Sequence, residues 1–170
     1  MSGNGNEHRK FLKSRTYKLF KEGDYLSDEL IINRKQDVLD LSMYKQKVDN
    51  GTVIFVMTTH CSACNFDSMT DYMNKYNKFN YLLLIETDHK FISELVSRVS
   101  NDKLSVIGAE IDIICKQLKF DVVPWVFALN KKGQFVAGRE FNSIKEAEFI
   151  TKPLLRVYYN EIWRNEINAK

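Results

Sequence analysis

Two cysteines separated by two residues are the part of this sequence best suited to chemistry. Cys61 and Cys64 form the motif CSAC, which follows an apolar, β-branched run, TVIFVMT, over residues 52–58. Such a run is typical of a strand buried on both faces, and the residues after the motif have the apolar period of a helix. Thiols three positions apart on a helix share one face, so the pair can close as a disulfide. The expected chemistry is thiol–disulfide exchange.

The place of the motif predicts a different role for each cysteine. The first turn of a helix has unpaired N–H groups and the positive end of the helix dipole, and both stabilise a thiolate. We therefore expect Cys61 to be exposed at the helix start and to act as the attacking thiolate. We expect Cys64 to lie one turn further in, to be more buried, and to resolve the mixed disulfide. A C-x-x-C between a buried strand and a helix is a much stronger signal than the motif alone.

Pro124 is the second unusual residue, because it interrupts a predicted strand over residues 122–129. Proline cannot donate to the hydrogen-bond ladder of a central strand. A cis peptide bond between Val123 and Pro124 would explain its presence, since cis bonds are almost confined to proline. The alternative is an edge strand that starts at Trp125.

The elements around these residues predict an α/β fold. Two alternating stretches, 29–33 and 37–41, indicate an N-terminal hairpin. Ser143 and Glu146 form a capping box that opens a long C-terminal helix, which Pro153 is expected to kink or interrupt. Strands that alternate with helices imply a central sheet with helices on both faces, and a terminal hairpin makes the sheet mixed. The predicted strands are 52–58, 81–86, 104–107, 122–129 and 134–137, and the predicted helices are 42–48, 62–78, 91–99, 109–119 and the one from 143 onward.

Charge divides the chain of 170 residues into two parts. Residues 1–22 hold six basic and two acidic residues, a net charge of +4, whereas residues 23–170 hold 19 basic and 20 acidic residues, a net charge of −1. We therefore predict a basic N-terminal extension, 1–22, and one folded domain, 23–170. The near-neutral body argues against nucleic-acid binding. No apolar run approaches the length of a transmembrane segment.

The extension has two interpretations. Charged segments are usually solvated, which favours a plain basic tail. Alternatively, the apolar side chains of Phe11, Leu12, Leu19 and Phe20 contact a membrane surface or a partner. The first ten residues contain no apolar segment of a secretory signal, so we expect a cytoplasmic location, where thiols are mostly reduced.

The sequence resembles thioredoxin-fold proteins in two runs, GTVIFVMTTHCSAC and FDVVPWVFALNKKGQFVAG, and the likeness spans residues 24–152. Its N-terminal hairpin resembles the thiol–disulfide oxidoreductases of the TlpA/ResA-like branch, which includes the cytochrome-maturation thioredoxins. The resemblance implies a thioredoxin-like fold with an N-terminal hairpin and an extended C-terminal helix. It also implies that Pro124 is a cis-proline facing the cysteines. Val123, through its backbone, and Trp125 are then expected to bind the substrate.

Two more residues enter the candidate site. The branch often has a glutamate three positions after its second cysteine, and here Asp67 holds that place. The resemblance makes Asp67 a proton acceptor for Cys64; the alternative is an acid that stabilises the first helical turn. His60 stands where the family usually has an aromatic residue, and protonated His60 would favour a Cys61 thiolate. Such departures imply a dedicated partner rather than a general-purpose thioredoxin.

The proposed activity needs no cofactor, and three other functions remain open. The protein could be a thioredoxin-like binding module without redox turnover. His60, Cys61 and Cys64 could bind zinc or copper, although a structural zinc site has four ligands. Thr58 and Cys61 form a T-x-x-C pattern, as in a peroxiredoxin site.

The expected substrate is a disulfide or dithiol on a protein or peptide partner. Because thioredoxin-like proteins also accompany secreted-peptide and bacteriocin maturation systems, the resemblance makes such a peptide a candidate. Cys115 lies on the apolar face of its predicted helix, and we expect it to pack in the core.

Overall fold

The structure, a computed structural model, describes residues 20–46, 50–99 and 101–159. The strands are β1 (Glu29–Ile31), β2 (Val38–Asp40), β3 (Thr52–Thr58), β4 (Asn80–Glu86), β5 (Leu104–Gly108), β6 (Trp125–Leu129) and β7 (Phe135–Glu140). The helices are α1 (Met43–Gln46), α2 (Phe66–Lys75), α3 (His89–Arg98), α4 (Ile111–Leu118) and α5 (Ile144–Tyr158).

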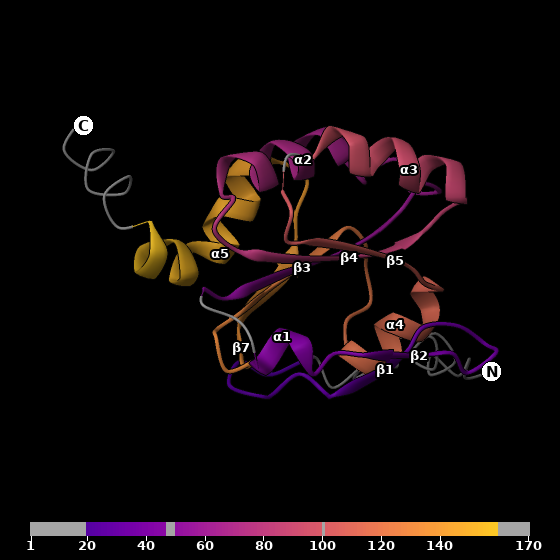
Figure 1. Cartoon of the computed structure of the whole chain (residues 1–170), viewed down its shortest axis with the longest axis horizontal. Coiled ribbons are helices and arrows are strands. Elements are labelled where there is room, and N and C mark those ends of the chain that lie inside the picture. The colour runs from indigo at the N-terminus through magenta and orange to yellow at the C-terminus, as the bar shows by residue number, and fades with distance from the viewer. Residues whose placement is uncertain (1–19, 47–49, 100, 160–170) are drawn as a thin grey trace, which may run out of the picture.

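A mixed sheet of five strands forms the centre, in the order β5-β4-β3-β6-β7 (Figure 1). β3 pairs in parallel with β4, and β4 in parallel with β5, whereas β6 runs antiparallel to both β3 and β7. β3 therefore lies in the middle of the sheet, and every one of its seven residues is buried. The predicted α/β class and mixed sheet are confirmed. β1 and β2 form the separate N-terminal hairpin.

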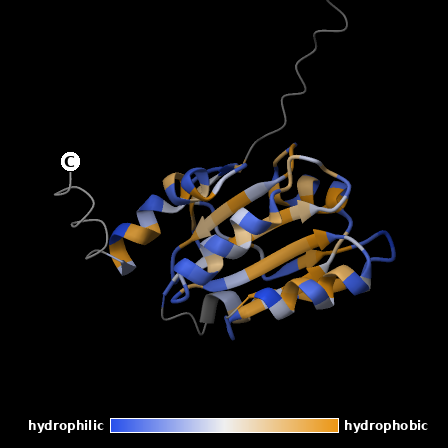
Figure 2. Cartoon of the chain, turned by 90° about the horizontal axis from the view of Figure 1, so that it is seen from above, coloured by the Kyte–Doolittle hydropathy of each residue, from blue (hydrophilic) through white to orange (hydrophobic). Residues whose placement is uncertain are grey.

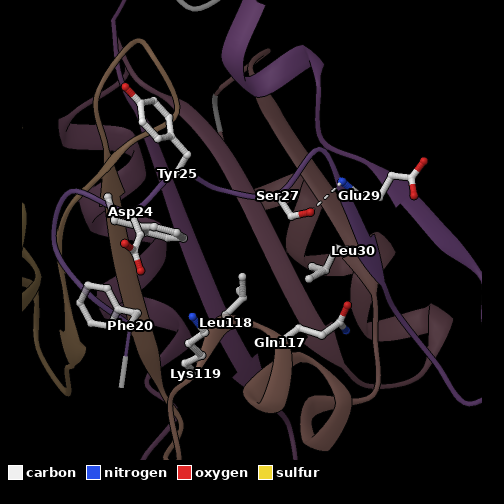
Figure 3. A pocket seen from close by; sticks show the side chains of 10 residues that line it. Phe20, Asp24, Tyr25, Ser27, Glu29, Leu30, Gln117, Leu118 and Lys119 are labelled. Carbon is white, nitrogen blue, oxygen red and sulfur yellow. Dashed lines mark hydrogen bonds between the residues drawn. The ribbon is translucent and has the colours of Figure 1, made fainter. Parts of the chain in front are cut away.

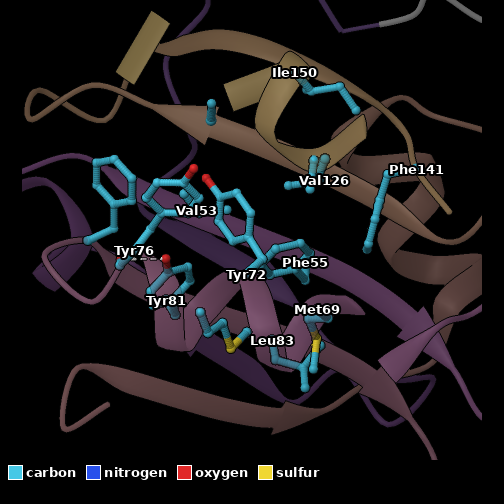
Figure 4. Close-up of a cluster of buried hydrophobic side chains, with 14 of the residues drawn as sticks. Val53, Phe55, Met69, Tyr72, Tyr76, Tyr81, Leu83, Val126, Phe141 and Ile150 are labelled. Atoms are coloured by element: carbon cyan, nitrogen blue, oxygen red, sulfur yellow. Dashed lines mark hydrogen bonds between the residues drawn. The ribbon is translucent and has the colours of Figure 1, made fainter. Parts of the chain in front are cut away.

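Helices cover both faces of the sheet (Figure 1). The first core lies between the sheet and α2, α3 and α5, and the second core lies between the sheet and α4, α1 and the hairpin. Alternate residues of β3 point into opposite cores, as the pleat of a strand requires: Phe55 joins the first core and Ile54 the second. Figure 2 shows apolar residues concentrated along the strands, and Figure 4 shows the first core close up. Fully burying one such side chain contributes about 1.5–3 kcal/mol.

The helix after the cysteines begins later than the sequence predicted. Asn65 caps α2, because its side chain accepts a hydrogen bond from the N–H of Ser68 at 2.9 Å. α2 therefore starts at Phe66 instead of Ser62, and the prediction that the cysteines occupy the first helical turn is wrong. Asn in front of an apolar helical period is a start signal that the sequence already carried.

Two other predicted boundaries also shift. The predicted strand 122–129 begins only at Trp125, as β6, because Pro124 precedes the ladder. β6 pairs on both sides, so it is not an edge strand. α5 continues through Pro153 to Tyr158, so the helix is not interrupted there.

The folded part of the chain includes Phe20, which the sequence had placed in the extension. The N–H of Phe20 donates to the carbonyl of Lys119 at 3.0 Å, and its ring meets that of Phe127 at a centroid distance of 5.2 Å. Phe20 thus packs against the second core, and the domain division at residue 22 stays a prediction. The other apolar residues proposed for a membrane or partner contact, Phe11, Leu12 and Leu19, lie outside the described residues. None of the described helices is long and apolar enough to cross a membrane.

Candidate active site

The two cysteines lie in a turn between the end of β3 and the start of α2. The N–H of Cys64 donates to the carbonyl of Cys61 at 3.1 Å, which closes the turn, and the two residues lie 3.8 Å apart. Both thiols are free. Cys61 is half-buried, whereas only 8% of Cys64 is exposed. The expected contrast between an accessible and a buried thiol is therefore present, although the helix dipole does not begin at Cys61.

Each thiol has a backbone partner. The Cys61 Sγ donates to the carbonyl of Val123 at 3.6 Å, and the N–H of Thr58 donates to the Cys64 Sγ at 3.5 Å. Burial raises the pKa of the Cys64 thiol to about 11, and the neighbouring Cys61 adds to the rise, while the Thr58 N–H opposes it. Cys64 is therefore protonated at neutral pH.

Val123 and Pro124 lie beside the cysteine turn, 62 positions away in sequence. The peptide bond between them is cis, and the carbonyl of Pro124 accepts a hydrogen bond from the N–H of Phe141 at 3.3 Å. Val123 is half-buried and touches both cores. This arrangement leaves the loop before β6 next to the accessible thiol.

Trp125 is the substrate-binding candidate that the structure buries. Only 7% of it is exposed, and its ring packs against those of Phe120 and Phe20 in the second core, with centroids 5.3 Å and 6.2 Å away. Its indole N–H has no hydrogen-bond partner among the residues that the structure describes. Substrate contact by Trp125 stays a prediction, and its packing points to a role in holding the loop that carries Pro124.

Asp67 lies on the first turn of α2 and pairs with Arg98 of α3. Its side chain is 76% exposed, and its carboxylate is not among the groups that perturb the Cys64 pKa. This arrangement favours the alternative, in which Asp67 stabilises the start of α2 and links it to α3.

His60 is exposed beside Cys61, and its N–H donates to the Thr58 Oγ1 at 3.2 Å. Within the described part of the chain, no three His, Cys, Asp or Glu residues are arranged to hold a metal ion. The donor set His60, Cys61 and Cys64 therefore does not form a metal centre in this structure.

Thr58 is a site residue whose role the sequence analysis missed. It had entered only through the T-x-x-C pattern, in which a peroxidase would use its hydroxyl at the reacting sulfur. Instead, the Thr58 Oγ1 donates to the carbonyl of Glu86 at 3.1 Å and accepts from His60. The hydroxyl is thus engaged by the backbone, which weighs against the peroxidase interpretation.

A separate cavity of about 340 Å³ lies between the N-terminal segment, the hairpin and the end of α4 (Figure 3). Phe20, Leu30 and Leu118 form apolar parts of its wall, and Asp24 and Lys119 are among its charged residues. None of its lining residues belongs to the cysteine turn. The cavity is therefore distinct from the candidate active site.

Comparison with known proteins identifies the fold. No protein-family model matches the chain, and no curated protein sequence matches it. The solved structures that resemble it include a thiol:disulfide interchange protein from Bacteroides sp. (15% identity, TM-score 0.52, 78% of this chain and 91% of that chain covered). They also include a DsbF homologue from Corynebacterium diphtheriae (19% identity, TM-score 0.52, 80% and 91% covered) and a thio-disulfide isomerase from Thermus thermophilus (16% identity, TM-score 0.53, 76% and 92% covered). The chain has the thioredoxin fold, as the sequence predicted.

Proposed function

We propose that this protein is a thiol–disulfide oxidoreductase in which Cys61 and Cys64 alternate between dithiol and disulfide. The main support for this activity is the arrangement of the two cysteines. A half-buried Cys61 and a buried Cys64 lie 3.8 Å apart at the end of the central strand. The names of the structurally similar proteins agree with this chemistry. A binding module without turnover has no need for two free thiols at this distance.

In the reducing direction the exchange takes two steps. The Cys61 thiolate attacks one sulfur of the partner's disulfide, forms a mixed disulfide and releases the other partner sulfur as a thiolate. The Cys64 thiolate then attacks the Cys61 Sγ, so that the Cys61–Cys64 bond forms as the bond to the partner breaks. The partner gains two electrons and two protons, and the protein loses them. The oxidising direction is the reverse sequence.

The neighbouring groups support these roles. The carbonyl of Val123, which accepts from Cys61, lies where the backbone of an extended partner peptide would pass the accessible sulfur. Cys64 is shielded from the partner because it is buried behind Cys61, and its raised pKa keeps it protonated until the mixed disulfide has formed. We propose a dedicated protein or peptide as the partner, and a peptide of a secreted-peptide or bacteriocin maturation system is a candidate by resemblance. The cytoplasmic location stays a prediction.

Reduction of insulin disulfides by dithiothreitol tests the proposal. We expect the wild-type protein to accelerate insulin precipitation, Cys61→Ser to abolish the acceleration, and Cys64→Ser to accumulate a mixed disulfide through Cys61. Cys115→Ser is the matched control and should retain the wild-type rate. A wild-type protein that neither accelerates the reaction nor traps a partner through Cys61 as Cys64→Ser would refute the proposal and favour a redox-inactive binding module.

A further inference from the structure

Thr58 makes hydrogen bonds to the neighbouring strand, to His60 and to both cysteines. It is the last residue of β3, and only 7% of it is exposed. Its hydroxyl donates to the carbonyl of Glu86 on the neighbouring strand β4 at 3.1 Å, and it accepts from the N–H of His60 at 3.2 Å. The hydroxyl therefore links the sheet to the segment that enters the cysteine turn.

The backbone of Thr58 is bound to both cysteines. Its carbonyl accepts from the N–H of Cys61 at 3.5 Å, and its own N–H donates to the Cys64 Sγ at 3.5 Å. The sheet sets the direction of this N–H, because β3 pairs with β4 as far as Thr58, whereas its pairing with β6 ends at Val56. The Cys64 sulfur can accept a hydrogen bond from this N–H only if the cysteine turn keeps its position relative to the end of β3.

We propose that Thr58 is a positioning residue of the resolving step: its hydroxyl holds the cysteine turn against the sheet, so that its main-chain N–H stays directed at the Cys64 sulfur. This inference rests on the proposed function. In the resolving step the Cys64 thiol loses its proton to solvent and attacks Cys61, and the leaving partner sulfur takes up a proton in turn. A hydrogen bond to a charged acceptor is about twice as strong as one between neutral groups, so the N–H stabilises the reacting thiolate more than the resting thiol.

The surroundings of Cys64 make this N–H important. The sulfur is buried, and desolvation disfavours its ionised form. In the described ranges, no carboxylate or basic side chain shifts the pKa of Cys64, and the Thr58 N–H is the one group there that lowers it. Asp67, the proton acceptor expected from the resemblance, instead pairs with Arg98. The backbone of Thr58 therefore takes over part of the stabilisation that a side chain could have supplied.

The test separates the two steps of the exchange. Thr58→Val keeps the shape and the N–H and removes the hydroxyl, Thr58→Ser restores a hydroxyl, and Thr59→Val is the matched control because Thr59 is exposed and its hydroxyl donates to Thr87. Attack by Cys61 on an aromatic disulfide is measured in the Cys64→Ser background. Resolution is measured, over a range of pH, as release of the second aromatic thiol in a single turnover.

In Thr58→Val the turn is no longer held against the sheet, so the retained N–H should lose its alignment with the Cys64 sulfur. We expect resolution to slow by about tenfold or more, as for the loss of one hydrogen bond to the Cys64 thiolate, and its pH profile to shift to higher pH. Attack by Cys61 should change less than about twofold, and Thr58→Ser and Thr59→Val should resolve like the wild type. Wild-type resolution in Thr58→Val, or equal slowing of both steps, would overturn the inference.

Two controls complete the design. If Thr58→Val does not fold, as judged by circular dichroism, Thr58→Ala is measured in the same way and decides by the same criteria. The wild-type protein separates this inference from the proposed function. A wild type that exchanges no thiols refutes the proposed function, whereas an active wild type with an unchanged Thr58→Val refutes only the role of Thr58.

Discussion

Cys64 and Cys115 lie in the cores on opposite faces of the sheet, and burial raises the pKa of both thiols to about 11. Their neighbours differ. Cys64 has a second thiol 3.8 Å away and a backbone N–H that donates to its sulfur. Cys115 has no such thiol, and the carboxylates of Asp112 and Asp121 further oppose its ionisation. A raised pKa therefore reports burial, and only the neighbouring groups distinguish a redox thiol from a packing residue.

The two cores also differ in how they treat polar groups. The first core buries tyrosines whose hydroxyls all have partners: Tyr72 donates to Thr151 at 2.6 Å and Tyr81 to the carbonyl of Tyr76 at 2.7 Å (Figure 4). The second core contains a group of aromatic rings: Phe20, Phe120, Trp125, Phe127 and Phe135. Within the described part of the chain, the indole N–H of Trp125 has no hydrogen-bond partner there. Both cores contain packed rings, but the first adds hydrogen bonds between its buried tyrosines and their neighbours, whereas the ring group of the second contains an indole N–H without one.

The largest expected effect is on alkylation of the thiols. A rise in pKa from 9.0 to about 11 lowers the thiolate fraction at neutral pH about a hundredfold, so Cys64 and Cys115 should react with iodoacetamide far more slowly in the folded protein than in the unfolded chain. We expect Cys61 to be the fastest of the three in the folded protein, because it is more accessible than Cys64 and is the proposed attacking thiol. Mass-mapped labelling of the reduced protein measures the three rates, and labelling in denaturant should make them similar. Equal rates in the folded protein would contradict the assigned roles of Cys61 and Cys64.

Gly138→Ala tests the ring packing of the second core. A Cβ at this position would lie 2.6 Å from the ring of Phe127 and 2.7 Å from that of Phe20, so a ring must move. We expect the free energy of unfolding to fall by about 1–3 kcal/mol, measured by denaturant titration. The same substitution in a Phe20→Ala background should cost less, because one of the two obstructing rings is absent. An unchanged cost in that background would show that Phe20 does not pack there.

Tyr72→Phe tests the hydrogen bonds of the first core with a smaller change. It removes the hydroxyl that donates to Thr151 and keeps the buried ring, so unfolding should become easier by about 0.5–1.5 kcal/mol. Tyr25→Phe is the matched control, because Tyr25 is 61% exposed, and it should leave stability unchanged. Equal stabilities of Tyr72→Phe and the wild type would remove the distinction between the two cores.

The smallest expected effect is on alkaline stability. The folded pKa of Cys115 lies above its value of 9.0 in an unfolded chain, so between pH 9 and 11 the unfolded state releases its proton first. Folding stability therefore falls as the pH rises through this window. Cys115→Ala should show a shallower fall than the wild type, and the difference should be modest because Cys115 is only half-buried. Identical slopes in denaturant titrations at several pH values would contradict the raised pKa.

Local patterns predicted most of the fold. The apolar run at 52–58 matches β3 residue for residue, because a strand buried on both faces needs an apolar side chain at nearly every position. Ser143 caps α5 as expected, since its hydroxyl accepts from the N–H of Glu146. The predicted start of α2 at residue 62 was wrong, because a helical period alone does not show which residue caps the helix. Asn65 is the cap, so the cysteine turn ends before the helix begins.

By itself, the sequence determined that two cysteines three positions apart follow a buried strand, because that signal depends on neighbours in the chain. The tertiary structure decided what surrounds them. The Val123 carbonyl reaches Cys61 across 62 positions, and Asp67 pairs with Arg98 across 31. Such contacts depend on the register of β3 with β4 and β6 and on the packing of α2 beside α3. That geometry emerges only when the cores close, because no local pattern encodes the distance between two separate elements.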